Sequence, residues 1–123
     1  FLIEKRAWFV PKRLNILLMT QASRVLIGKF DFNAFRSISC QSNSSVRSID
    51  NIKIKENINN IEIRVTGKSF LHNQVRIIVG TLVNVGKKVW NEEKVLNILE
   101  SKERKNAGPT APAHGLYLEK IEY

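Results

Sequence analysis

The chain has 123 residues, of which 20 are Lys or Arg and 11 are Asp or Glu, so its net charge is +9 and its pI is near 10.0. A hydrophobic fraction of 43% is enough for one modest core, but no apolar stretch of the sequence is long enough to span a bilayer. The single cysteine, Cys40, excludes a disulfide framework within the chain and favours a reducing, cytoplasmic compartment.

The strong positive charge makes a polyanion the first candidate partner, and nucleic acid is the commonest polyanion. A genome biased toward Lys, Asn and Ile would raise the charge as well, so charge alone does not decide the partner. The sequence starts at Phe1 without an initiator methionine or a signal-peptide pattern. We therefore expect the chain to be a piece of a longer protein.

The first third of the chain predicts a strand and a helix. An aromatic and β-branched run within residues 1–10 predicts a strand that stops at Pro11. Apolar residues then recur at helical spacing, and Gly28 is placed to cap the end of that helix. The Ser-, Asn- and Gln-rich stretch at 37–45 predicts a loop. The apolar positions of the helix are Leu14, Leu17, Leu18, Ala22, Val25 and Leu26.

The middle of the chain predicts a β-hairpin with one buried face. Strand character resumes near Val46, and residues 57–60 predict a turn. Ile61, Ile63 and Val65 then alternate with polar residues, which is the period of a strand with one face in the core.

The remainder predicts two helices, a shaped loop and a final strand. One helix follows Gly67 and ends at Gly86, and a shorter helix begins at an N-cap residue, Asn91. Residues 107–115 hold two prolines and two glycines, which predicts a structured loop before a strand over 116–123. The apolar positions are Leu71, Val75, Ile78, Val79 and Leu82 in the first helix, and Val95, Leu96, Ile98 and Leu99 in the second.

The order of these elements is strand, helix, strand, strand, helix with a short helix after it, and strand. This βαββαβ order predicts an α+β fold of the RRM-like or ferredoxin-like kind, in which helices cover one face of an antiparallel sheet. We expect residues 1–123 to form one domain.

Arg76 is the residue best placed to carry chemistry, because it lies beside the apolar stripe of its helix. His72, Arg76 and Gly80 follow one another at intervals of four residues along that helix. A guanidinium beside apolar surface is costly unless an anion pairs with it. Arg76 is therefore either half of a structural ion pair or a fixed cation for a carboxylate or phosphate. Gly80 would let another backbone approach the helix closely.

Other polar residues carry weaker signals. His72 and His114 are either surface or capping residues or contacts for RNA. No cysteine or carboxylate accompanies them at ligand spacing, so we expect no metal site. Asp31 stands between two phenylalanines, where a turn or cap role is the default.

Four segments of the chain resemble the C-terminal half of the TruA-type family of tRNA pseudouridine synthases. They read GKFDFNAF at 28–35, FLHNQVRIIVG at 70–80 and RKNAGPTAPAHGL at 104–116, and a closing strand runs to Tyr123. The second and third segments are long and specific, and the resemblance covers nearly the whole chain.

This resemblance implies one of two related RRM-like halves whose sheets join across a basic cleft. It implies an enzyme that isomerises uridine to pseudouridine in the anticodon stem-loop of tRNA, without a cofactor or metal, as a homodimer. Arg76 would pair with the nucleophilic aspartate of the family, and Gly115 and Leu116 would line the base pocket. We expect RNA contacts from His72 and Asn73 and from the basic residues Lys12, Arg13, Arg24, Arg36 and Arg47.

Two catalytic parts of the family are missing from this sequence. The Arg-Thr-Asp-x-Gly type motif that carries the nucleophile is absent, and the catalytic tyrosine would precede Phe1. We therefore expect the chain to hold half of an active site and to be inactive alone. The alternatives are an RNA-binding fragment without catalysis and a basic domain with a protein partner.

Overall fold

The computed structural model describes residues 2–11, 13–37, 44–58, 60–71, 73–111 and 116–122, with the backbone alone over 2–11 and 116–122. The strands are β1 (Leu2–Pro11), β2 (Gly28–Asp31), β3 (Val46–Glu56), β4 (Asn60–Gly67) and β5 (Leu116–Glu122). The helices are α1 (Ile16–Ser23), α2 (Gln74–Gly86) and α3 (Glu92–Ser101), with 3₁₀ turns at Arg24–Leu26, Asn33–Phe35 and Arg104–Asn106.

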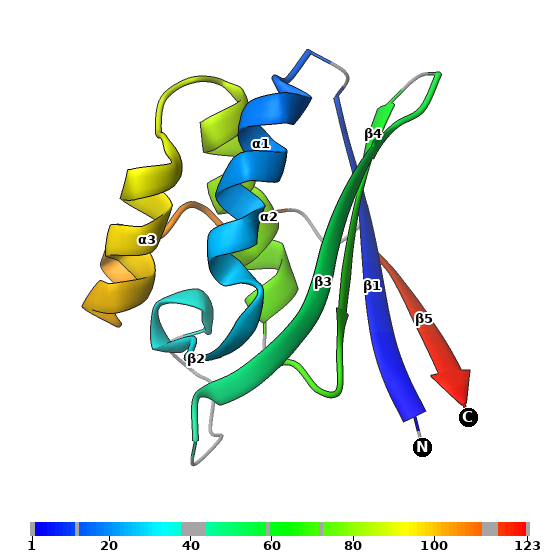
Figure 1. The fold of residues 1–123 in the computed structure, drawn as a ribbon, viewed down its shortest axis with the longest axis vertical. Helices are drawn as coiled ribbons and strands as arrows, with labels where there is room; N and C mark the ends of the chain where they lie inside the picture. The colour runs from blue at the N-terminus through cyan, green and yellow to red at the C-terminus, as the bar shows by residue number, and fades with distance from the viewer. Residues whose placement is uncertain are drawn as a thin grey trace.

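The five strands form one antiparallel sheet in the order β2-β3-β4-β1-β5, and the three α-helices cover one face of it (Figure 1). Strand β1 pairs with both β4 and β5, so the first and last strands of the chain lie side by side. The predicted α+β class, with an antiparallel sheet and helices on one face, is confirmed.

Strand β2 was not predicted, and it extends the sheet beyond β3. Gly28, which was expected to cap a helix, instead begins β2 and pairs with Ile49 of β3. Its φ of 131° lies outside the left-handed helical region that a C-cap glycine adopts. The helical path ends before Gly28, because Ile27 is already extended.

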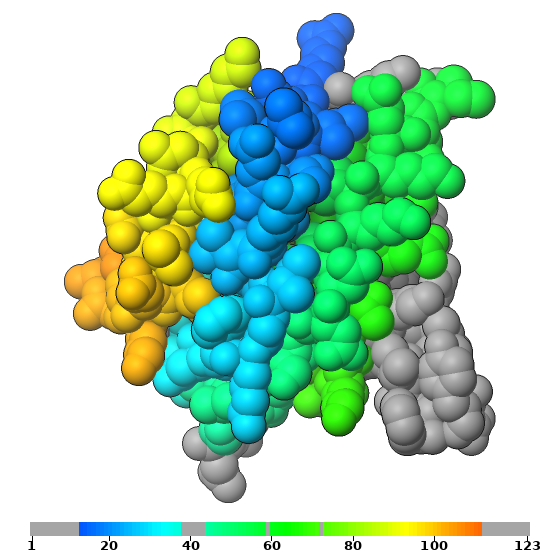
Figure 2. All heavy atoms as spheres, viewed as in Figure 1, coloured from blue at the N-terminus to red at the C-terminus, as the bar shows by residue number. Residues whose placement is uncertain are grey.

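Helix α1 is shorter than predicted and turns a different face to the core. It begins after Asn15, whose side-chain oxygen accepts a hydrogen bond from the backbone N–H of Leu18 at 3.0 Å. Met19 and Ala22 are fully buried, whereas Leu17, one of the apolar positions of the predicted helix, is 67% exposed. On the helical face, α1 lies between α3 and β3 (Figure 2).

The β3–β4 hairpin has the single buried face that the alternation predicted. Ile61, Ile63 and Val65 of β4 and Ile52 of β3 are buried in the core. Successive side chains of a strand point to opposite faces, so the residues between them form the face that no helix covers.

Helix α2 is the most buried of the three helices. It begins at Gln74, later than predicted, so Leu71 precedes it, but all of the predicted apolar positions lie in the core. It ends at Gly86, as predicted. Helix α3 begins after its predicted N-cap, Asn91, whose side-chain oxygen accepts a hydrogen bond from Lys94 N at 2.9 Å. Of its predicted apolar positions, Val95, Ile98 and Leu99 are buried, whereas Leu96 is 41% exposed.

Candidate active site

The segment 107–111 lies directly against α2, and two glycines make that contact possible. A Cβ added to Gly80 would lie 1.7 Å from the carbonyl oxygen of Pro109, and one added to Gly108 would lie 2.8 Å from Thr81 Cα. Only glycine allows two backbones to come so close. The close backbone approach predicted at Gly80 is confirmed.

A buried hydroxyl fastens the same contact. Thr81 Oγ1 accepts a hydrogen bond from the N–H of Gly108 at 3.0 Å and donates one to the carbonyl oxygen of Ile77 at 2.9 Å. Sequence reasoning missed both Thr81 and Gln74, which are fully buried polar residues of α2. They are seven residues apart and therefore share one face of the helix. Polar residues at this spacing in an otherwise apolar helix are the signal that could have found them.

Arg76 reaches from α2 to the end of this segment. Its Nε donates a hydrogen bond to the carbonyl oxygen of Ala111 at 2.7 Å, and its Nη1 donates one to Asn73 Oδ1 at 3.1 Å. The backbone N–H of Ala111 donates to the carbonyl oxygen of Arg76 at 3.1 Å. Ala111 is thus bonded through both of its peptide groups to one residue of α2.

The charge of Arg76 is not neutralised by any carboxylate in the part of the chain that the structure describes. Its two acceptors are neutral oxygens, and its Nη2 has no hydrogen-bond partner among the described residues. The side chain is half-buried, so an anion could still approach the guanidinium. This arrangement favours the interpretation of Arg76 as a fixed cation over that of a structural ion pair.

The turn before α2 holds Asn73 against Arg76. Asn73 adopts a left-handed backbone conformation with φ of 61°, which asparagine tolerates better than most residues. Behind it, the side-chain oxygen of Gln74 accepts a hydrogen bond from the N–H of Leu71 at 2.8 Å, and Gln74 N–H donates to the carbonyl oxygen of Leu71 at 3.0 Å. Leu71 and Gln74 therefore exchange two hydrogen bonds that fix the turn leading into α2.

A hollow of about 420 Å³ opens beside Asn73. Of the described residues that line it, two carry cations, two carry hydroxyl groups and one carries an amide, and none is a carboxylate. The lining residues are Ser37, Asn73, Arg104, Lys105 and Thr110.

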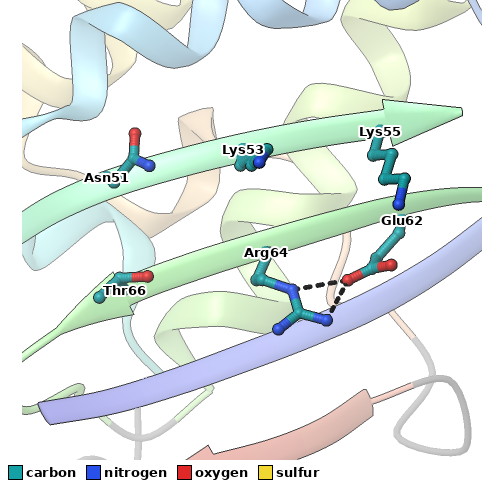
Figure 3. A pocket seen from close by; sticks show the side chains of 6 residues that line it. All are labelled: Asn51, Lys53, Lys55, Glu62, Arg64 and Thr66. Atoms are coloured by element: carbon teal, nitrogen blue, oxygen red, sulfur yellow. Dashed lines mark hydrogen bonds and ion pairs between the residues drawn. The ribbon is translucent and has the colours of Figure 1, made fainter.

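A second polar groove, of about 380 Å³, lies on the helix-free face of the sheet (Figure 3). There Arg64 donates from Nε to Glu62 Oε2 at 2.6 Å, and its Nη2 lies 2.5 Å from the same oxygen. Lys53 stands directly opposite Arg64 in the pairing of β3 with β4. The groove is lined by Asn51, Lys53, Lys55, Glu62, Arg64 and Thr66.

Among the described residues that were predicted to contact RNA, none of the four arginines hydrogen-bonds to Arg76. Arg13 and Arg24 are exposed and flank the two ends of α1, whose eight residues span about 12 Å. Arg36 and Arg47 are half-buried, and Arg47 Nη1 donates to the carbonyl oxygens of Ser44 and Val46. Asn73, which was also predicted to contact RNA, does hydrogen-bond Arg76.

Several predicted residues cannot be placed. Lys12, His72, His114 and Gly115 lie outside the described residues, and Leu116 is described only as the first backbone position of β5. Across the ranges that the structure describes, no three His, Cys, Asp or Glu side chains gather where they could hold a metal ion. None of the helices found there has the length and apolar character needed to cross a membrane.

Comparison with known proteins identifies the family. The family model described as tRNA pseudouridine synthase matches residues 22–123. The tRNA pseudouridine synthase A of Anaplasma phagocytophilum is 49% identical over 118 residues, which are 96% of this chain and 48% of that protein. That of Anaplasma marginale (strain Florida) is 53% identical over 119 residues, with the same shares. That of Wolbachia pipientis subsp. Culex pipiens is 51% identical over 116 residues, or 94% and 47% of the two chains.

The chain thus spans about half the length of the curated relatives that it matches. The family model covers the last two residues of α1 and all of β2, β3, β4, α2, α3 and β5, including the segment that packs on α2. The chain therefore belongs to the tRNA pseudouridine synthase family.

Proposed function

We propose that this chain supplies the C-terminal half of the active site of a tRNA pseudouridine synthase, which isomerises uridine to pseudouridine in the anticodon stem-loop of tRNA. The partner would be tRNA, the complete protein would be a homodimer, and the reaction would need neither a cofactor nor a metal. The observation that carries the proposal is the uncompensated guanidinium of Arg76, held in place by Ala111 and Asn73.

The reaction breaks the glycosidic C–N bond of uridine, turns the uracil and joins its C5 to the sugar, after which C5 loses its proton. A carboxylate is needed close to the sugar or the base throughout. A cation beside a carboxylate favours its ionised form, and two parallel hydrogen bonds from a guanidinium fix its orientation. Arg76 would do both for an aspartate that the other half of the protein supplies.

The segment that packs on α2 would form the other side of the site. Gly80 and Gly108 hold residues 107–111 against the helix, and this sets the starting point of the chain that leads to Gly115 and Leu116. In the proposal these two residues provide apolar surface for the target base, which must leave its stack at a cost of a few kcal/mol. Phosphate contacts from basic side chains would offset that cost.

The test is reconstitution from two halves. The chain is assayed for pseudouridine formation in an anticodon stem-loop RNA, alone and together with the half of the Anaplasma marginale relative that it does not match; the pair is called here the reconstituted protein. We expect turnover only from the reconstituted protein.

Two results would contradict this proposal. Pseudouridine formation by the chain alone would show that it contains its own nucleophile. RNA binding by the reconstituted protein without any turnover would support the alternative of a non-catalytic RNA-binding domain. A control half in which the nucleophilic aspartate is replaced by asparagine separates a failure of assembly from a failure of chemistry.

A further inference from the structure

The hollow beside Asn73 has the size and chemistry of an anion site. Its volume of about 420 Å³ lies in the range of small-ligand pockets, roughly 300–1,000 Å³. The described residues that line it offer N–H and O–H donors and two positive charges, and none of these residues is a carboxylate. Phosphate oxygens accept hydrogen bonds and carry negative charge, so they match this lining.

Arg104 is held at the edge of the hollow and keeps most of its donors available. It begins a 3₁₀ turn in which Ala107 N–H donates to its carbonyl oxygen at 3.1 Å. Its Nη2 donates to Thr110 Oγ1 at 3.1 Å, and none of its other N–H groups has a partner among the described residues. A guanidinium has five donors in a planar fork, which suits two oxygens of one phosphate.

Lys105 adds a second charge that is only weakly engaged. Its Nζ lies 3.4 Å from Glu103 Oε2, and the two side chains are 79% and 55% exposed. An exposed ion pair of this kind contributes little to stability, so an incoming phosphate could take the place of Glu103.

The hollow is joined to Arg76 through Asn73, whose Oδ1 accepts from Arg76 Nη1 and whose side chain also lines the hollow. Asn73 would therefore separate an anion held there from the guanidinium of Arg76, which is proposed to act at the reacting uridine. In an RNA strand, a phosphodiester flanks every nucleoside on each side. We propose that Arg104 and Lys105 hold a backbone phosphate of the RNA next to the target uridine, an assignment that rests on the proposed function.

The competing explanation is that Arg104 only braces the segment 107–111 through Thr110. Replacing Thr110 by valine removes that hydrogen bond while leaving both charges in place. Among the described residues, the Lys105 side chain pairs with Glu103 and not with the segment 107–111, so Lys105→Ala tests the charge without disturbing the brace. Lys87, an exposed cation just past the C-terminal end of α2 and about 20 Å along the helix from Asn73, is the matched control.

The experiment measures binding of a fluorescently labelled anticodon stem-loop RNA to the 123-residue chain over a series of salt concentrations. Each lost phosphate contact reduces the slope of log K against log salt by about one. We expect that reduction for Lys105→Ala and for Arg104→Ala, with affinity lowered several-fold, and an unchanged slope for Thr110→Val and Lys87→Ala.

Three outcomes would overturn the proposal. They are a Lys105→Ala slope equal to that of Lys87→Ala, an effect of Thr110→Val as large as that of Arg104→Ala, and no binding of the RNA by the unmodified chain. Because the readout is binding, a failure here is distinct from a failure to form pseudouridine in the reconstituted protein.

Discussion

Two arginines of this chain show how differently a protein can hold the same charge. Arg64 lies on the helix-free face of β4 and places two of its nitrogens on the carboxylate of Glu62, two residues earlier on the same face (Figure 3). Arg76 lies at the start of α2, and among the described residues its side chain donates only to the neutral oxygens of Ala111 and Asn73. The first charge is compensated within its own strand. The second is oriented but left positive, which is the state required of a group that must hold an outside carboxylate.

The largest effect should come from removing the uncompensated arginine. In the reconstituted protein, we expect Arg76→Ala to lower turnover by about 100-fold or more, because a misplaced catalytic group costs rate on that scale. Arg76→Lys keeps the charge without the planar fork, so its turnover should lie between that of the unmodified reconstituted protein and that of Arg76→Ala. Turnover is measured by pseudouridine formation, with RNA binding measured in parallel.

The matched control for that prediction is Arg64→Ala, which should leave turnover within a factor of about two, because the charge of Arg64 is already paired with Glu62. Wild-type turnover of Arg76→Ala would refute the role proposed for Arg76. An equal loss from the two arginines would remove the distinction between them.

Replacing the amide of Asn73 by a carboxylate should give Arg76 a charged partner, as Arg64 already has in Glu62. Asn73→Asp places a carboxylate oxygen where Asn73 Oδ1 now accepts from Arg76, and aspartate tolerates the left-handed backbone at this position. A charge-assisted hydrogen bond is worth about 1.5–3 kcal/mol. The new carboxylate would compete with the nucleophile for Arg76, so we expect turnover to fall roughly 10- to 100-fold.

The stability of the Asn73→Asp chain should not fall along with its turnover. Urea denaturation of the Asn73→Asp chain should give an unfolding free energy equal to or above that of the unmodified chain. Unchanged turnover at unchanged stability would mean that Arg76 does not need its positive charge free for another group.

The third prediction concerns the contact that presents Ala111 to Arg76. Gly80→Ala places a methyl group where the Pro109 carbonyl now lies, and backbone cannot move aside as a flexible side chain can. Overpacking of this kind costs about 1–3 kcal/mol, which exceeds the helix propensity gained on replacing glycine. Chemical denaturation measures this loss of unfolding free energy.

Gly86→Ala is the control. At Gly86 the nearest atoms are side-chain atoms of Met19 and Leu14, so Gly86→Ala should lower the unfolding free energy less. The reverse order would contradict the assigned role of Gly80.

The smallest effect should come from releasing the compensated arginine. Glu62→Gln keeps an oxygen that can accept from Arg64 but removes the negative charge. We expect the unfolding free energy to change by less than about 1 kcal/mol. The groove that also holds Lys53 and Lys55 then becomes more positive, so RNA binding should tighten modestly and depend more steeply on salt. A salt titration measures both quantities, and a weaker affinity would contradict the expectation.

Periodicity predicted those parts of the fold that depend on which face of an element is buried. The alternation of Ile61, Ile63 and Val65 suffices to orient β4, because a strand has only two faces. The exposure of Leu17 could not be read from the pattern, because packing against α2 decides which side of α1 is buried. Strand β2 was missed because four residues carry too little pattern to be recognised.

The sequence was enough to predict which residues belong to the candidate site, but not which groups those residues contact. A glycine in an apolar helix indicates close approach, and an arginine beside it indicates an anion; these two signals were enough to select Gly80 and Arg76. The acceptor of Arg76 Nε lies 35 residues away, and its position depends on the backbone path of 107–111. No local pattern carries that information. The positions of Gly115 and of the Leu116 side chain remain predictions.

The two-way bonding of Ala111 to Arg76 has a consequence for motion. Ala111 belongs to neither a helix nor a strand, yet its N–H donates to the main chain of α2 while its oxygen receives the guanidinium. Its amide hydrogen should therefore exchange with solvent water as slowly as hydrogens inside the helix, rather than at the rate of an ordinary connecting stretch. Exchange at Ala111 would require the segment 107–111 to separate from the start of α2, so the two should open as one cooperative unit.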